Sequence, residues 1–207
     1  MDRLLFILAI VIAYFLGNIS PSILLGRAMG VDIKKEGSGN AGTTNALRVL
    51  GKKAAVITLI VDIGKGVIAV LLGNVLAGPE AAMYCALAAF AGHVWPAMFH
   101  FKGGKGVATS LGVVLLLDWR IGVTVLVVAL LIMVLTRYVS LGSVAAAVVF
   151  MALQIADMII TGEFNAVRLV CVLVLGFLLI IRHHANISRL LKGTENKLGG
   201  KKKEETA

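Results

Sequence analysis

The chain has 207 residues and is 59% hydrophobic but only 15% charged. A soluble domain is about 45–50% apolar and about 25% charged, so this composition excludes an ordinary soluble protein and indicates an integral membrane protein. The net charge of +9 does not indicate nucleic-acid binding, because the basic residues lie in short loops and the tail, and only 6% of residues are aromatic.

About seven apolar runs predict an all-α bundle of membrane-spanning helices. A helix needs about 20 apolar residues to cross the hydrocarbon core, where unpaired backbone groups are not tolerated. The chain should form one transmembrane domain, residues 1–193, followed by a cytoplasmic basic tail, residues 194–207. The end of this tail, KKKEETA, is expected to be disordered. The predicted spans cover residues 4–25, 54–77, 80–101, 106–118, 121–137, 139–161 and 166–182.

The fourth run, residues 106–118, is too short for a full crossing, since it holds only about a dozen apolar residues. Two interpretations remain open. It is a short helix that begins below the membrane interface, or it forms a re-entrant hairpin with the fifth run and turns at Asp118-Trp119-Arg120. In both cases the chain returns to the same side of the membrane by Arg137.

The distribution of lysine and arginine predicts the orientation of the bundle. With the N-terminus outside, 16 of the 20 basic residues lie on the cytoplasmic side, three lie outside, and Lys65 lies within a span. Cytoplasmic loops of membrane proteins are enriched in lysine and arginine, so this division places the loops at 26–53 and 102–105 and the C-terminus in the cytoplasm.

The first of these loops contains the sequence EGSGNAGTTNALRVLG, residues 36–51. Glycines expose backbone N–H groups in tight turns, short polar side chains add donors and acceptors, and an arginine fork suits phosphate or carboxylate. A plain hydrophilic connector is the alternative, but it needs far fewer glycines and amides. The candidate binding residues are Gly37, Ser38, Asn40, Thr44, Asn45 and Arg48.

The second loop, HFKGGKGVATSLG at residues 100–112, has the components of a phosphate cradle. It is not a Walker A motif, yet its glycines permit a nest of N–H groups and a helix N-terminus follows. Two lysines anchored at lipid headgroups are the alternative, which does not explain the glycines. The candidate residues are Lys102, Gly103, Gly104, Lys105, Gly106 and Thr109.

The third polar stretch is RHHANISRLLKG, residues 182–193, where His183 and Asn186 share one helical face. An interfacial helix that meets anionic lipid explains its arginines but not Asn186. Upstream of the second loop, His93 lies near the inner end of the third run, and Pro96 should bend that helix.

Asp62 and Lys65 are ionisable residues inside the second run, three positions apart, so they should pair and face the bundle interior. The four histidines show no H-x-x-x-H spacing and the two cysteines form no cluster, so no metal site is predicted. A site of glycines, amides and cations at the membrane surface suits a small phosphorylated molecule from the cytosol.

The three stretches GSGNAGTTNALRVLG, GHVWPAMFHFKGGKGVATSLG and RHHANISRLLKGTEN resemble motifs of the bacterial acyl-phosphate-dependent glycerol-3-phosphate acyltransferases, the PlsY family. The resemblance implies a multi-pass protein of the bacterial cytoplasmic (inner) membrane whose active site faces the cytoplasm. It implies acyl transfer from acyl phosphate to the 1-hydroxyl of glycerol 3-phosphate, giving lysophosphatidic acid and phosphate, the first step of phospholipid synthesis. No cofactor is implied, and the oligomeric state and acyl-chain preference stay open.

The resemblance also implies roles for individual residues, although which phosphate each loop binds and which group accepts the proton stay open. This sequence departs from the family's pattern at Ala97, Met98 and Ala185, which affects packing. The residues expected to be catalytic are Ser38, Arg48, Lys105, His183 and Asn186. Those expected to bind substrate are Gly37, Asn40, Thr44, Asn45, His93, Lys102, Gly103, Gly104, Gly106, Thr109 and Glu195.

Two other functions fit part of the sequence. A transporter of a phosphorylated anion explains the glycines and cations, but it is expected to carry polar groups deep in several spans, whereas only Asp62-Lys65 and Gln154-Asp157 qualify. A non-enzymatic assembly factor does not need amides and glycines on one face. The H-x-x-x-x-D dyad of soluble-headed glycerolipid acyltransferases is absent after all four histidines.

Overall fold

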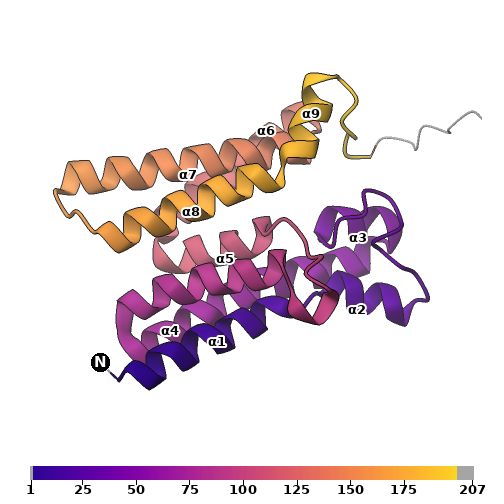
Figure 1. The fold of residues 1–207 in the computed structure, drawn as a ribbon. Coiled ribbons are helices and arrows are strands. Elements are labelled where there is room, and N and C mark those ends of the chain that lie inside the picture. Colours follow the sequence, from indigo (N-terminus) through magenta and orange to yellow (C-terminus); the bar gives the residue numbers. More distant parts are fainter. Residues whose placement is uncertain (1, 200–207) are drawn as a thin grey trace, which may run out of the picture.

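The computed structural model describes residues 2–199, and every regular element among them is helical. The predicted KKKEETA tail lies outside the described residues. The helices form two groups, with α1 to α5 in one and α6 to α9 in the other (Figure 1). The elements are α1 (Arg3–Asn18), α2 (Pro21–Ala28), α3 (Thr43–Val49), α4 (Lys52–Val94), the 3₁₀ turn η1 (Ala97–Phe99), α5 (Val107–Leu117), α6 (Trp119–Thr136), α7 (Val139–Thr161), α8 (Ala166–Arg182) and α9 (His184–Leu191).

The first apolar run is broken, so the prediction of one continuous helix over residues 4–25 is wrong. Helix α1 ends at Asn18, and α2 continues at an angle of 40° from it. Pro21 occupies the first position of α2 and has no N–H to continue the hydrogen-bond ladder. Because a proline also disfavours helical backbone in the preceding residue, Ser20 is extended, with φ −115° and ψ 92°.

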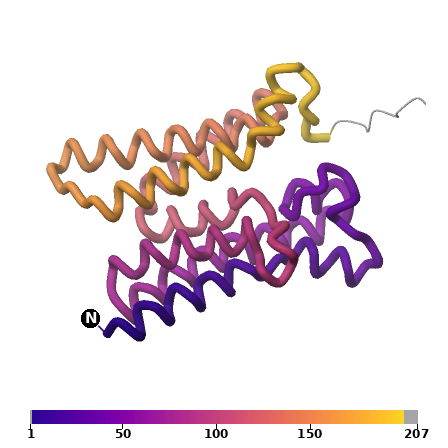
Figure 2. The backbone as a smooth tube through the Cα atoms, viewed as in Figure 1, coloured from indigo at the N-terminus to yellow at the C-terminus, as the bar shows by residue number. Residues whose placement is uncertain are grey.

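Helix α4 contains the predicted span 54–77 and residues 80–94 of the predicted span 80–101, as antiparallel arms. Ala77 and Gly78 leave the helical conformation, and Gly78 has φ +85°. The arms then approach so closely that a Cβ on Gly73 would lie 2.8 Å from the carbonyl oxygen of Ala81, and Figure 2 shows the chain folding back. The second arm ends at Val94, so Pro96 terminates this helix instead of bending it.

Helix α5 has 11 residues, which corresponds to about 16 Å, roughly half of the hydrocarbon core. The chain turns at Asp118, where the sequence placed the turn, and Asp118 accepts a hydrogen bond from the Ile121 N–H at 3.2 Å. Three helices are long and apolar enough to cross a membrane when α4 is counted once. The number rises to five if each of the bent pairs, α1 with α2 and α8 with α9, forms one span. The seven-span count and the orientation therefore stay predictions.

Helix α1 packs on α4 through small residues, with Ala9 and Ala13 of α1 buried beside Ala69, Cys85 and Ala89 of α4. Such residues let two helix backbones approach closely in a membrane. The resulting contact holds the end of α4 that carries His93. All three polar stretches then meet at one end of the bundle, where α2, α3 and α9 lie, while the N-terminus lies at the other end (Figure 1).

Candidate active site

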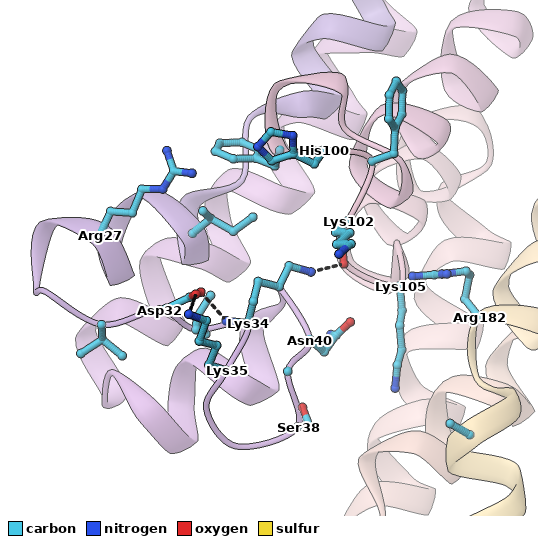
Figure 3. Close-up of a pocket in the computed structure, with 18 of the residues that line it drawn as sticks. Arg27, Asp32, Lys34, Lys35, Ser38, Asn40, His100, Lys102, Lys105 and Arg182 are labelled. Atoms are coloured by element: carbon cyan, nitrogen blue, oxygen red, sulfur yellow. Dashed lines mark hydrogen bonds and ion pairs between the residues drawn. The ribbon is translucent and has the colours of Figure 1, made fainter.

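A cavity of about 1020 Å³ opens at this end of the bundle, between the loop that follows α2, the turn before α5, and α9 (Figure 3). Asp32 is the only carboxylate among its described lining residues. An excess of cations in a concave surface concentrates anions there. The lining cations are Arg27, Lys34, Lys35, Lys102, Lys105, Arg182 and Arg189.

Lys105 lies between the two groups of helices and donates a short hydrogen bond to the Asn186 side-chain oxygen. This contact joins the turn before α5 to α9. Burial lowers the pKa of Lys105 to about 8. The negative charge of Glu195 opposes this change, whereas the positive charges of Arg189, Arg182 and Arg48 lower the pKa further. The ammonium group is therefore poorly solvated and surrounded mainly by like charges, so an anionic ligand would stabilise it.

Glu195 fixes the other end of Asn186. Its Oε1 accepts from Asn186 Nδ2 at 2.6 Å and from the Ser140 hydroxyl at 2.8 Å, while Oε2 accepts from Arg189 Nε at 2.7 Å. Burial alone would raise the pKa of this carboxyl, but the three hydrogen bonds hold it below its usual range. Glu195, which was expected to bind substrate, lies behind Asn186 and orients it.

His183 begins the turn into α9 and is only 2% exposed. Its Nδ1 lies 2.8 Å from the Leu179 carbonyl oxygen. Because a carbonyl only accepts, Nδ1 carries the hydrogen and Nε2 is free to accept one. Burial and the Lys105 charge lower the pKa of His183 to about 4, so the imidazole is neutral at physiological pH.

Asn45 organises the first polar loop from inside. It is fully buried, accepts from the Ser38 N–H at 2.9 Å, and donates to the carbonyls of Ile33 and Glu36 at 3.1 and 3.0 Å. All its hydrogen bonds go to the loop, which places Ser38 and Asn40 at the cavity. Gly37 adopts φ +62° directly against the Asn45 side-chain oxygen, where a Cβ would collide.

Arg48 and Thr44 lie on α3, outside the residues that line the cavity. Burial lowers the pKa of Arg48, and the nearby Glu195 charge opposes this change. Arg48 therefore approaches the Lys105–Asn186–Glu195 network from the side of α3, so the first and third polar stretches meet as the sequence predicted.

The glycines of the second loop allow close packing of this loop against its neighbours. The N–H groups of Gly103 and Gly104 donate to the carbonyls of Val94 and His93, each at 3.1 Å, so these two amides are not free for a phosphate. A Cβ on Gly104 would collide with the His93 ring and the Ala41 carbonyl. Gly106 begins α5 with φ +85°, a backbone conformation that favours glycine.

His93 and Thr109 are buried away from the cavity lining. Lys65 Nζ donates to His93 Nδ1 at 2.8 Å, contacts Asp62 Oδ1 at 2.7 Å, and donates to the Gly17 and Ile19 carbonyls at 3.0 and 2.7 Å. The predicted Asp62–Lys65 pair is thus present, and it satisfies carbonyls released at the break between α1 and α2. Thr109 packs against α4, and its hydroxyl has no hydrogen-bond partner among residues 2–199.

Sequence reasoning did not assign Lys34 to the site. Its Nζ donates to the Gly103 carbonyl at 2.9 Å, bridging the first and second loops (Figure 3). Burial and then the Arg182 charge lower the pKa of Lys34 to about 8. The sequence does contain a signal for this role, because the pair Lys34-Lys35 directly precedes the glycine-rich stretch.

Comparison with known proteins identifies the family. The sequence profile of the glycerol-3-phosphate acyltransferases matches residues 7–193. The chain belongs to this acyltransferase family. The glycerol-3-phosphate acyltransferase of Thermoanaerobacter pseudethanolicus is 44% identical over 196 residues, covering 94% of this chain and 96% of that protein. The protein of the same name from Clostridioides difficile is 43% identical over 209 residues, covering 98% and 100%.

Solved structures agree with this assignment. The crystal structure of PlsY, an integral membrane glycerol 3-phosphate acyltransferase, in its glycerol 3-phosphate form superposes with a TM-score of 0.86 at 36% identity, covering 94% of this chain and 96% of that chain. The lysophosphatidic acid form gives a TM-score of 0.83 at 38% identity, covering 94% and 95%. This acyltransferase is therefore an all-helical integral membrane protein of the PlsY type, as the motifs indicated.

Proposed function

We propose that this acyltransferase moves a fatty acyl group from acyl phosphate to the 1-hydroxyl of glycerol 3-phosphate, releasing phosphate and lysophosphatidic acid as the first step of phospholipid synthesis. One observation carries the proposal. The cation-lined cavity lies at the end of an apolar bundle and contains Lys105 bonded to Asn186. Both substrates carry a phosphate, and the acyl chain enters from the bilayer.

In the reaction, the hydroxyl oxygen attacks the acyl carbon, the bond from that carbon to the phosphate oxygen breaks, and phosphate leaves. The hydroxyl proton needs an acceptor. His183, with a pKa of about 4, is a weaker base than a phosphate, whose second pKa is about 6. The leaving phosphate therefore takes the proton. We assign His183, which is buried behind the cavity lining next to Arg182, to orienting the hydroxyl by accepting a hydrogen bond at Nε2.

The cations act on charge that develops during transfer. Negative charge grows on the carbonyl oxygen and on the leaving phosphate, and preorganised donors in a poorly solvated site stabilise it strongly. Lys105, held by Asn186, is the first such donor, and Arg48 approaches it from α3. Ser38 and Asn40 line the cavity and supply neutral donors to glycerol 3-phosphate.

The proposed location is the bacterial cytoplasmic membrane, with the cavity facing the cytoplasm. The sequence-based topology, which assigns 16 basic residues to the cytoplasmic side and three to the outside, supports this orientation. Glycerol 3-phosphate then arrives from the cytosol, and the acyl donor and the product occupy the bilayer.

The test is a donor comparison with purified protein in detergent. Acyl phosphate and labelled glycerol 3-phosphate should give lysophosphatidic acid and one phosphate per turnover, and acyl coenzyme A should give none. Robust turnover with the thioester, in the absence of acyl phosphate, would contradict the proposed donor.

A further inference from the structure

The chain does not leave the bundle after α9 but returns to the start of α7. The segment that does so, residues 194–198, is called the C-terminal strap below. It begins where the Thr194 N–H donates to the Arg189 carbonyl at 2.8 Å, and its Glu195 accepts from the Ser140 hydroxyl of α7. Asn186 and Arg189 of α9 bond the same carboxylate. The position of Asn186 therefore depends on the position of the strap.

Arg137, in the turn between α6 and α7, fixes the far end of the strap. Its carbonyl accepts from the Leu198 N–H at 2.7 Å, and its guanidinium donates to the Leu198 carbonyl through Nη2 at 2.9 Å and Nε at 3.2 Å. Lys197 adds a cation–π contact with the Tyr138 ring at 5.4 Å. Three hydrogen bonds from a single residue thus hold Leu198, three positions beyond Glu195.

The backbone at Arg137 makes an arginine there unusual. It ends α6 with φ +63° and ψ 11°, the left-handed conformation that glycine usually adopts after a helix. A residue with a Cβ is disfavoured there. The guanidinium gives a physical reason for the arginine, because glycine would keep the backbone bond to Leu198 and lose both side-chain bonds.

We propose that Arg137 is a positioning residue for acyl transfer, which anchors the C-terminal strap so that Glu195 holds Asn186 against Lys105. The inference rests on the proposed roles of Lys105 and Asn186 in the reaction. Arg137 itself is exposed and does not line the cavity. It acts through Leu198, Glu195 and Asn186, and does not touch substrate.

The arrangement predicts a specific electrostatic consequence. Four charged residues act on Lys105: Glu195 of the strap, Arg189 of α9, Arg182 of α8 and Arg48 of α3. Only Glu195 among them favours the ammonium. When the strap loosens, Lys105 loses this partner and keeps its cationic neighbours, so its proton is lost at a lower pH.

The experiment compares Arg137→Ala with Arg120→Ala, which replaces an exposed arginine in the first turn of α6, at the other end of that helix. Arg137→Ala should lower kcat roughly three- to thirty-fold, the effect of losing charge-assisted hydrogen bonds at an exposed site. KM should change less, and the basic limb of the pH–kcat profile should move to lower pH. Arg120→Ala should match the wild type, and Arg137→Lys, which keeps one donor, should recover part of kcat.

Two further variants separate positioning from a general loss of folding. Leu198→Pro removes the strap N–H that bonds the Arg137 carbonyl, so it should reproduce both the loss of kcat and the shift in pH. In a Glu195→Gln background, Arg137→Ala should lower kcat by less than about two-fold, since the residue through which it acts is already impaired. Thermal unfolding in detergent confirms that each variant folds.

Wild-type kinetics for Arg137→Ala would overturn the inference. It would also be overturned if Arg137→Ala lowered kcat equally in the wild-type and Glu195→Gln backgrounds. If the wild-type protein makes no lysophosphatidic acid from acyl phosphate, the proposed donor is wrong. The inference is then decided by calorimetric binding of glycerol 3-phosphate as a function of pH. Loss of binding at a lower pH in Arg137→Ala than in Arg120→Ala supports it, and identical profiles overturn it.

Discussion

The pH dependence of kcat/KM, which reports ionisations of the free enzyme, should follow the ionisation of Lys105. Burial lowers its pKa to about 8, so about nine-tenths of the protein carries the ammonium at pH 7 and about one-tenth at pH 9. If the reaction needs the ammonium to offset developing negative charge, kcat/KM should therefore fall roughly tenfold over this interval. The substrates do not cause this limb, because a second phosphate pKa of about 6 makes them about nine-tenths dianionic at pH 7 and almost wholly so at pH 9.

Lys34 also has a pKa lowered to about 8, so the assay must distinguish the two lysines. The measurement is kcat/KM between pH 6 and 10 for the wild type, Lys105→Arg and Lys34→Arg. An arginine stays protonated across this range. The basic limb should therefore move above pH 9 in Lys105→Arg, even if its maximal rate is lower, and stay near pH 8 in Lys34→Arg. The opposite pattern would refute the assignment of Lys105.

Three other perturbations test the fold and the loops. Gly104→Ala should lower thermal stability and kcat together, because overpacking against His93 costs about 1–3 kcal/mol and displaces Lys105. An effect on KM alone would contradict this and indicate that the added methyl group crowds a bound phosphate. Lys65→Met should destabilise the protein by about 3–5 kcal/mol, because the buried Asp62 carboxylate loses its ammonium partner and keeps His93 Nδ1 at 3.4 Å. Adding Asp62→Asn should recover part of this loss in thermal unfolding. Cysteines placed at Lys35 and Gly162 should be labelled from opposite faces of the membrane, and labelling from one face would contradict the predicted topology.

The apolar runs and polar stretches could be predicted from the sequence because they depend on local composition. The turn at Asp118 follows from a polar residue between two apolar runs, and the meeting of the three polar stretches follows from their placement on one side. The break between α1 and α2 was missed, although Pro21 marks it, since the run is apolar on both sides. Lys65 donates a hydrogen bond to the Ile19 carbonyl at this break. The two residues are 46 positions apart, so this contact depends on tertiary packing and cannot be predicted from local sequence.

The individual roles of polar residues were harder to predict, because residue type does not show what a side chain faces. Asn45 and Ser38 belong to the same glycine-rich stretch, yet Asn45, on α3, directs its amide to the loop backbone while Ser38 lines the cavity. Gly103 and Gly104 fit a phosphate nest by sequence alone. The structure shows that their N–H groups instead pair with the end of α4, which only the position of His93 and Val94 determines.

The acidic side chains close to the cavity do not neutralise its positive charge, because each is engaged by other partners. Glu195 is held by three donors, and Asp62 is buried against Lys65. Asp32 accepts from the Lys34 N–H at 3.0 Å and forms an exposed 3.8 Å ion pair with Lys35. None of these carboxylates is placed to neutralise Lys105 and Arg182 at once. Bringing like charges together in a partly desolvated site is unfavourable, so the cations are stabilised most by a ligand that carries two negative charges and several acceptor oxygens. A phosphate monoester has both properties, which connects the arrangement of charge to the family's substrate.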